Sequence, residues 1–164
     1  MALQSKMTVY AAIAGMLALM GGIVYYASLD NPALEQVKIE LHNVEIIDVN
    51  NIENKASLQV TFMVKNPSEK TFTVPSITYQ LYGDERLIGS GQYSTEDIAM
   101  PGRAAFYPEA EIPLESKLVI TKSEANAEIY EDVVNNRINN FSVQGTIAAE
   151  TAWSIIEKEF DSST

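Results

Sequence analysis

Few side chains in this sequence combine the types and the spacing that catalysis or metal binding requires. His42 is the single histidine and cysteine is absent, so histidine-based and thiolate-based metal sites both lack ligands. A serine nucleophile would have only His42 as its base. Gly89 and Gly91 lie in a predicted strand and open no helix, which excludes a phosphate-binding loop. We interpret His42 as a structural or exposed residue.

Two carboxylate pairs have a spacing that could serve acid–base chemistry or calcium binding. Glu109 and Glu111, and likewise Glu157 and Glu159, would share one face of a strand. No other polar motif converges on either pair, so solvated strand faces are the preferred interpretation. We therefore expect no catalytic, cofactor-binding or metal-binding residues, and we predict that the protein is not an enzyme.

The charge of the chain limits its partners. The 164 residues carry a net charge of −11, and Lys6 is the only charged residue before position 30. The part after Leu29 therefore has 10 basic and 22 acidic side chains, a net charge of −12. Phosphate backbones would repel such a surface, so we expect no nucleic-acid binding.

Residues 7–29 are expected to form a membrane anchor. This stretch contains no charge, and as a helix it would measure about 33 Å, close to a hydrocarbon core of roughly 30 Å. Tyr10 lies near one end, and Tyr25 and Tyr26 near the other, as aromatic residues do at membrane interfaces. A cleaved signal peptide is the competing interpretation, but its apolar region is shorter, and residues 25–28 match a cleavage site poorly.

The residues that flank this helix predict its orientation. Lys6 precedes it, whereas Asp30 and Glu35 follow it, and basic flanks stay in the cytoplasm. Residues 1–6 are then a cytoplasmic N-terminus, and the rest of the chain lies outside the cytoplasm at the cell membrane. There, Asn140-Phe141-Ser142 matches an N-glycosylation acceptor, although chance explains such a match equally well.

Small residues recur along the anchor at helical spacing. Ala14, Ala18 and Gly22 are four residues apart, and Ala11 and Gly15 form a parallel row. Such rows allow two helix backbones to approach closely within lipid. Because alanine and glycine are common in these helices, chance is the equal alternative.

Residues 30–36 read as a linker in which Pro32 ends the helix. Residues 37–160 read as one domain, and residues 161–164 as a tail.

Alternating apolar and polar residues predict about seven strands, with turns every 8 to 12 residues. The alternation slips at His42-Asn43, which predicts a bulge or a break. One helix is expected near 122–135, with Thr121 and Glu124 as a capping box. The strands cover roughly 37–46, 56–65, 72–82, 86–93, 104–114, 141–149 and, less clearly, 152–160.

The fold class that follows is mainly β: an antiparallel β-sandwich with one helix, preceded by a single transmembrane helix.

The order of motifs within 37–160 resembles the water stress and hypersensitive response (WHy) domain found in the second group of late embryogenesis abundant (LEA) proteins. The asparagine–proline step that ends a strand is its most telling part. The motifs are Asn66-Pro67, Val74-Pro75, Ile88-Gly89-Ser90-Gly91, Pro101-Gly102 and Ile112-Pro113-Leu114. The resemblance implies an immunoglobulin-like or fibronectin-like sandwich without enzyme activity, linked to desiccation and stress tolerance and often membrane-anchored. The charge and the anchor suggest an archaeal, exported form.

Two functions are compatible with these observations. The first is an interaction or structural module that serves as an accessory subunit of a larger membrane complex, with other membrane subunits and the lipid bilayer as partners. The implied lineage suggests an archaeal ammonia monooxygenase-type complex as one host. The alternative is a stand-alone, membrane-tethered protein that protects against drying or osmotic stress.

Overall fold

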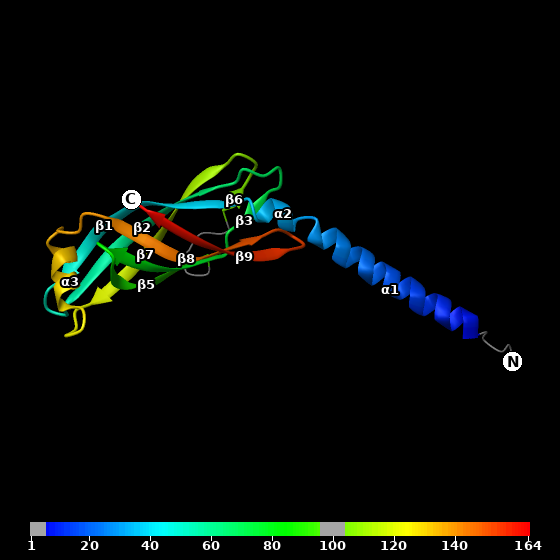
Figure 1. Ribbon diagram of the computed structural model, residues 1–164, viewed down its shortest axis with the longest axis horizontal. Coiled ribbons are helices and arrows are strands. Elements are labelled where there is room, and N and C mark those ends of the chain that lie inside the picture. Colours follow the sequence, from blue (N-terminus) through cyan, green and yellow to red (C-terminus); the bar gives the residue numbers. More distant parts are fainter. Residues whose placement is uncertain (1–5, 96–103) are drawn as a thin grey trace.

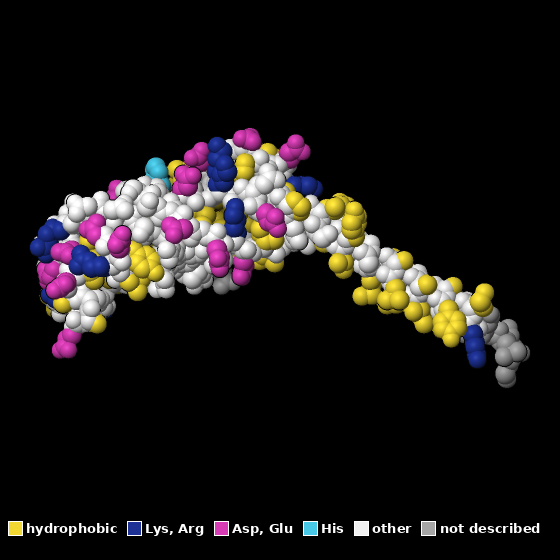
Figure 2. Space-filling model, viewed as in Figure 1, with side chains coloured by type: hydrophobic (Ala, Val, Ile, Leu, Met, Phe, Trp, Pro, Cys, Tyr) yellow, Lys and Arg dark blue, Asp and Glu magenta, His cyan; other side chains and the backbone are white. Residues whose placement is uncertain are grey.

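The computed structural model describes residues 6–95 and 104–164 and consists of a long helix attached to one end of a β-sandwich (Figure 1). Helix α1 covers Lys6–Ser28, and a short helix α2 covers Asn31–Leu34. The single long helix is apolar enough to cross a membrane, and none of its residues is buried by the rest of the chain. Its apolar side chains stand out in Figure 2, whereas acidic side chains spread over the sandwich. The Pro101-Gly102 motif lies outside the described residues.

Nine strands form two antiparallel sheets in the described part of the chain. One sheet has three strands in the order β1-β2-β7, and the other has six in the order β5-β4-β8-β3-β6, with β9 paired to β8. The strands are β1 Lys38–Asn50, β2 Lys55–Lys65, β3 Phe72–Thr73, β4 Ser76–Gly83, β5 Arg86–Ser94, β6 Ala105–Phe106, β7 Glu111–Thr121, β8 Phe141–Glu150 and β9 Ile155–Ser163. The mainly β, antiparallel fold class is confirmed.

The core lies between the two sheets and is built from alternate residues of each strand. On β2, Leu58, Val60, Phe62 and Val64 are fully buried. The Phe62 ring meets the Tyr79 ring of β4 at 4.9 Å between centroids and 68° between planes, so it packs across the sandwich in an edge-to-face contact. Because side chains alternate between faces with a period of two, every second residue of β2 points to the core.

The alternation located the bulge in β1 correctly. The register with β2 shifts between Leu41 and Asn43, so His42 is the extra residue there, and its side chain is exposed. A second shift lies between Ile46 and Asp48, where the apolar run offered no signal. Both bulges lie on an edge strand, where they disturb pairing with another chain.

Two of the expected strands are wrong in their extent. The run 72–82 is split at Val74-Pro75, because proline lacks the N–H that would continue the ladder. The run 104–114 is split by a turn in which Glu109 adopts a positive φ of 63°. Glu109 and Glu111 therefore do not share a strand face. The second strand of this run then continues to Thr121, well beyond the predicted end.

The helix and both ends of the predicted domain also need correction. Helix α3 covers only Ala127–Val134. The predicted capping box of Thr121 and Glu124 does not precede it. Instead, Asn126 is the residue before the helix, and its side chain accepts a hydrogen bond from the Ser123 N–H. The expected tail belongs to β9, which reaches Ser163 because β8 offers it a complete ladder. The strand interpretation of 152–160 is confirmed from Ile155 onward.

At the asparagine–proline step, hydrogen bonds of one buried residue join three chain segments. Asn66 is fully buried. Its Nδ2 donates to the carbonyl oxygens of Lys70 and Phe106, each at 2.8 Å, while its Oδ1 accepts from the Ser68 N–H and hydroxyl. Its backbone N–H donates to the Ala110 carbonyl at 2.9 Å. The side chain thus connects the β2–β3 turn to β6, and the backbone N–H connects it to the chain between β6 and β7.

Candidate functional site

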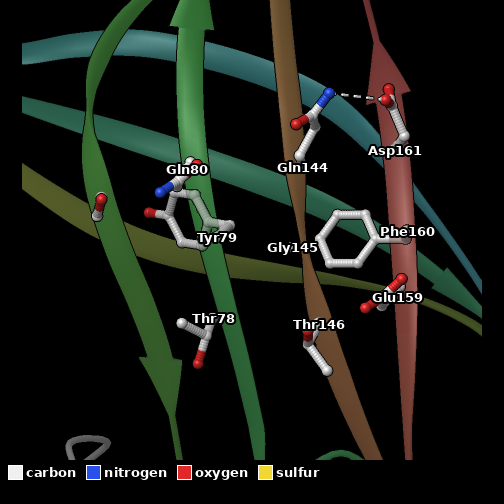
Figure 3. Close-up of a pocket in the computed structure, with 10 residues that line it drawn as sticks. Thr78, Tyr79, Gln80, Gln144, Gly145, Thr146, Glu159, Phe160 and Asp161 are labelled. Carbon is white, nitrogen blue, oxygen red and sulfur yellow. Dashed lines mark hydrogen bonds between the residues drawn. The ribbon is translucent and has the colours of Figure 1, made fainter.

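The outer face of the six-stranded sheet contains an open groove of about 690 Å³ (Figure 3). It runs across four neighbouring strands, β5, β4, β8 and β9. Hydroxyl, amide and carboxylate groups project from it. The lining residues are Thr78, Tyr79, Gln80, Ser90, Gln144, Gly145, Thr146, Glu159, Phe160 and Asp161.

Strand register arranges the groove side chains in two cross-strand rows. One row consists of Ser90, Gln80, Gln144 and Asp161, because each of these residues is paired with the next across the sheet. Side chains opposite one another in an antiparallel sheet lie close enough to interact. Within this row, the Gln144 amide donates to the Asp161 carboxylate at 3.1 Å. The row therefore presents hydrogen-bonding groups at a regular interval.

The second row runs parallel to the first. Thr78, Thr146 and Glu159 line the groove and are paired across β4, β8 and β9, and Gln92 of β5, which is paired with Thr78, continues this row beside the groove. Both rows therefore begin with uncharged polar groups and end with a carboxylate on β9. Such a face can bind hydrogen-bond donors along its length and a cationic group at its β9 end.

The groove floor is held by residues that point inward from the same strands. The Tyr79 hydroxyl donates to the Ser116 hydroxyl at 3.0 Å, and Ser116 donates to the Gln92 carbonyl at 3.1 Å. This chain of bonds ties the two sheets together under the groove. Burial raises the pKa of the Tyr79 phenol, and the hydrogen bond with Ser116 opposes that shift to a smaller extent.

Two glycines beneath the groove lie where a Cβ atom would collide with β4. A Cβ atom at Gly91 would lie 2.5 Å from the Tyr79 ring, and one at Gly145 would lie 2.2 Å from the Thr78 carbonyl oxygen. Gly91 therefore leaves room for the Tyr79 ring, and Gly145 allows the backbones of β8 and β4 to approach closely.

A second polar cluster lies where the helix meets the sandwich, and we call it the junction. Asp30 is 9% exposed and lies two residues after the end of α1. Its carboxylate accepts from the Thr151 hydroxyl at 3.0 Å and forms an ion pair with Lys70 at 3.3 Å. The Asn31 side chain accepts from the Ser154 hydroxyl. Both hydroxyls belong to the turn between β8 and β9.

The predicted linker is thus part of the fold. Leu34 is fully buried in the sandwich core. The Lys158 ammonium donates to the carbonyls of Glu35 and Val37, each at 2.8 Å, and so binds the segment between α2 and β1. Residues 30–36 therefore connect the helix to the sandwich through buried and hydrogen-bonded contacts, and not as a flexible spacer.

The opposite end of the molecule contains structural ion pairs. Asp132 of α3 binds Arg86 at 2.6 Å and Arg137 at 3.2 Å, and Lys122 pairs with Glu131. The hydrogen bond that Arg86 donates to the Asp132 carboxylate raises the pKa of Arg86. These pairs join α3 to β5 and to the chain on either side of the helix.

The residues predicted to pack in the membrane lie along the free surface of α1. All five are exposed, and a Cβ at Gly15 or Gly22 would meet no atom within 4 Å. All five lie in α1, and their packing against a partner helix stays a prediction. The five are Ala11, Ala14, Gly15, Ala18 and Gly22.

The other candidate residues are dispersed. Asn140 is exposed in the loop before β8, an accessible position for a glycan. Glu157 and Glu159 share the outer face of β9. No group of three or more His, Cys, Asp or Glu side chains suited to a metal ion occurs within residues 6–95 and 104–164. That the protein is not an enzyme stays a prediction.

Sequence reasoning missed both the groove and the junction. The groove residues are the polar half of ordinary alternating strands, and only strand order brings the four strands together. A signal for the junction did exist, since Leu34 is an apolar residue close to Pro32, but it does not indicate burial against β9. The prediction that Pro32 ends the long helix is wrong: α1 ends earlier, at Ser28, and Pro32 lies in the first turn of α2, where the missing N–H has no helical partner to lose.

No family model and no curated protein sequence matches the chain. Solved structures do match its fold. A protein of Arabidopsis thaliana determined in solution matches with a TM-score of 0.54 at 15% identity, over 77% of this chain and 78% of that one. A protein of Archaeoglobus fulgidus matches with a TM-score of 0.47 at 12% identity, over 76% and 94%.

A protein named as late embryogenesis abundant (LEA) matches with a TM-score of 0.45 at 11% identity, over 98% of this chain and 87% of that one. At these identities the likeness concerns the fold alone.

Proposed function

We propose that this chain is a non-catalytic, membrane-tethered β-sandwich that presents a protein-binding face at a fixed height above the bilayer, as an accessory subunit of a membrane assembly. The rigid junction is the observation that carries the proposal. Asp30 and Leu34 are both buried immediately after the apolar helix, and the β8–β9 turn is hydrogen-bonded to this segment. A tether that only retained the domain at a membrane would not need these contacts.

The groove is the face that we assign to the partner. Its two rows offer amide and hydroxyl groups along β5, β4 and β8 and carboxylates along β9. The domain as a whole is strongly acidic. A protein surface rich in hydrogen-bond donors and in lysine or arginine complements this face. Within the membrane, the row of Ala14, Ala18 and Gly22 supports a contact with a second helix.

Site-specific photo-crosslinking in native membranes tests this assignment. A photoreactive residue at Gln144, on the outer face of β8, is expected to crosslink to another subunit. The matched control is Gln59, which occupies the outer face of β2 in the other sheet. Equal crosslinking at both positions, or none at either together with migration of the extracted protein as a monomer on native gels, would count against the proposal.

The orientation of the chain can be tested independently because the chain has no cysteine. Ile52 is 94% exposed in the turn between β1 and β2. This turn lies at the end of the sandwich away from α1 (Figure 1). The variant Ile52→Cys should react with a membrane-impermeant maleimide in intact cells if the domain lies outside the cytoplasm. Labelling only after lysis would reverse the proposed orientation.

The resemblance of the Asn66-Pro67 and Val74-Pro75 motifs to WHy domains supports a second function, membrane-tethered protection against desiccation or osmotic stress. Cells lacking the protein would then survive drying or osmotic shock less well than wild-type cells. Equal survival of the two strains would remove this candidate.

A further inference from the structure

The turn between β8 and β9, residues 151–154, carries an exposed aromatic side chain at the membrane-facing end of the sandwich. Trp153 is 63% exposed, and its ring meets the Tyr26 ring at 6.4 Å between centroids and 83° between planes. Ile155, two residues later, is 60% exposed. Tyr26 is 62% exposed as well, so exposed apolar side chains gather at this end of the sandwich, as they do at surfaces that another apolar phase covers.

The length of the anchor places this turn at the boundary of the bilayer. Twenty residues separate Lys6 from Tyr26 in one continuous helix, which is about 30 Å, the thickness of a hydrocarbon core. With Lys6 at one boundary, Tyr26 lies at the other. Trp153 contacts Tyr26 and therefore lies at the same depth, in the layer that tryptophan and tyrosine favour.

The contacts of the turn hold it at that depth. The Thr151 hydroxyl donates to Asp30 at 3.0 Å, the Ser154 hydroxyl donates to Asn31, and the Thr151 N–H donates to the Ser154 carbonyl at 2.8 Å. The turn is thus fixed to the first residues after α1. The half-exposed Lys70 ammonium at the same level suits the phosphate groups of lipids.

We propose that residues 151–154 insert into the head-group layer of the bilayer that α1 spans, with Trp153 as a second membrane anchor. This inference rests on the proposed membrane tether. Two attachment points, the helix and the turn, would set the tilt of the sandwich. They would thereby also set the direction in which the groove faces.

Trp153 is the only tryptophan in the chain, so its fluorescence reports on this position alone. Full-length protein is reconstituted at low density into phosphatidylcholine vesicles, with or without lipids brominated near the head group. We expect a blue-shifted emission and the loss of most of the intensity in brominated vesicles. The matched control is Trp153→Phe combined with Ile52→Trp, which moves the reporter to the far end and should give water-like emission without quenching.

The outcomes separate this inference from the tether. If the protein does not float with vesicles on a density gradient, the tether itself is wrong, and the inference falls with it. If the protein floats but Trp153 is unquenched and accessible to acrylamide, the tether stands and the insertion is wrong. If Trp153 is shielded from acrylamide without bromine quenching, a protein contact covers it, and the inference is overturned as well.

Discussion

Replacement of Asn66 by alanine should destabilise the sandwich more than any other change at a polar residue near the β2–β3 turn. Asn66 is fully buried, and its side chain takes part in four hydrogen bonds of 2.7–3.0 Å. Alanine would leave the Lys70 and Phe106 carbonyls and the Ser68 N–H without this partner.

The size of the effect follows from these bonds. Each makes a net contribution of about 1 kcal/mol, and a buried group left without a partner costs about 1–3 kcal/mol. Because the Lys70 carbonyl still accepts from the Ser68 hydroxyl, only part of that cost applies. We therefore expect Asn66→Ala to lower the free energy of unfolding by about 3–4 kcal/mol, and the melting temperature by roughly 10 °C for a domain of this size.

Urea and thermal unfolding of the full chain in mild detergent, followed by far-ultraviolet circular dichroism, would measure the loss. Asn43→Ala is the matched control, because Asn43 is exposed and its side chain donates only to neighbouring Glu45. It should change the free energy of unfolding by less than about 0.5 kcal/mol. A loss at Asn66 no larger than that of the control would refute the reasoning from buried hydrogen bonds.

Asn66→Asp adds a pH test of the same argument. A carboxylate there would face the Lys70 and Phe106 carbonyl oxygens, to which Asn66 now donates. The folded state would therefore favour the protonated acid, with a pKa above the unfolded value of about 3.9. Since the folded state then binds more protons, the variant should gain stability relative to wild type as the pH falls from 7 towards 4. A pH-independent difference between the two proteins would contradict this.

Three further predictions concern packing and ionisation. Gly145→Ala should lower the free energy of unfolding by about 3 kcal/mol, because the new Cβ would lie 2.2 Å from a backbone oxygen. Gly21→Ala, whose Cβ would have no atom within 4 Å, should leave it unchanged in the same unfolding assay. Leu34→Ala should lower the free energy of unfolding by about 2–4 kcal/mol in urea titrations, because it empties a fully buried position. The control Leu29→Ala, at a half-exposed position, should lower it by less than about 0.5 kcal/mol. Equal losses in the two variants would mean that the junction is not packed. Burial raises the pKa of Tyr79, so the folded state keeps that proton when the unfolded chain releases it, and stability should fall as the pH rises above about 10. Melting temperatures across this range should decline less steeply in Tyr79→Phe, and an unchanged slope would argue against this cause.

Much of the fold could be read from local patterns. The uncharged stretch after Lys6 predicted a helix, and a helix covers Lys6–Ser28. Alternation along β2 predicted which side chains are buried, because one face of that strand packs against the other sheet throughout. The phase slip at His42 located a real bulge, since an extra residue moves every later side chain to the opposite face.

The limits of elements were less predictable because they depend on neighbours. Nothing local to residues 161–164 indicates a strand, yet β8 extends far enough to pair with residues 161–163. Helix α3 starts later than its sequence pattern indicates, because Asn126 turns the chain by bonding to Thr121 and Ser123.

By itself, the sequence determined the apolar helix, the acidic surface and the alternation that makes two layered sheets, because each depends on residue type and on spacing within one segment. Only the tertiary structure decided the groove, the buried hydrogen bonds of Asn66 and the closed junction at Asp30. Each of these joins segments far apart in the chain: Asp30 meets Thr151, for example, across 121 positions. Strand order and register set such meetings, and local periodicity carries no information about them.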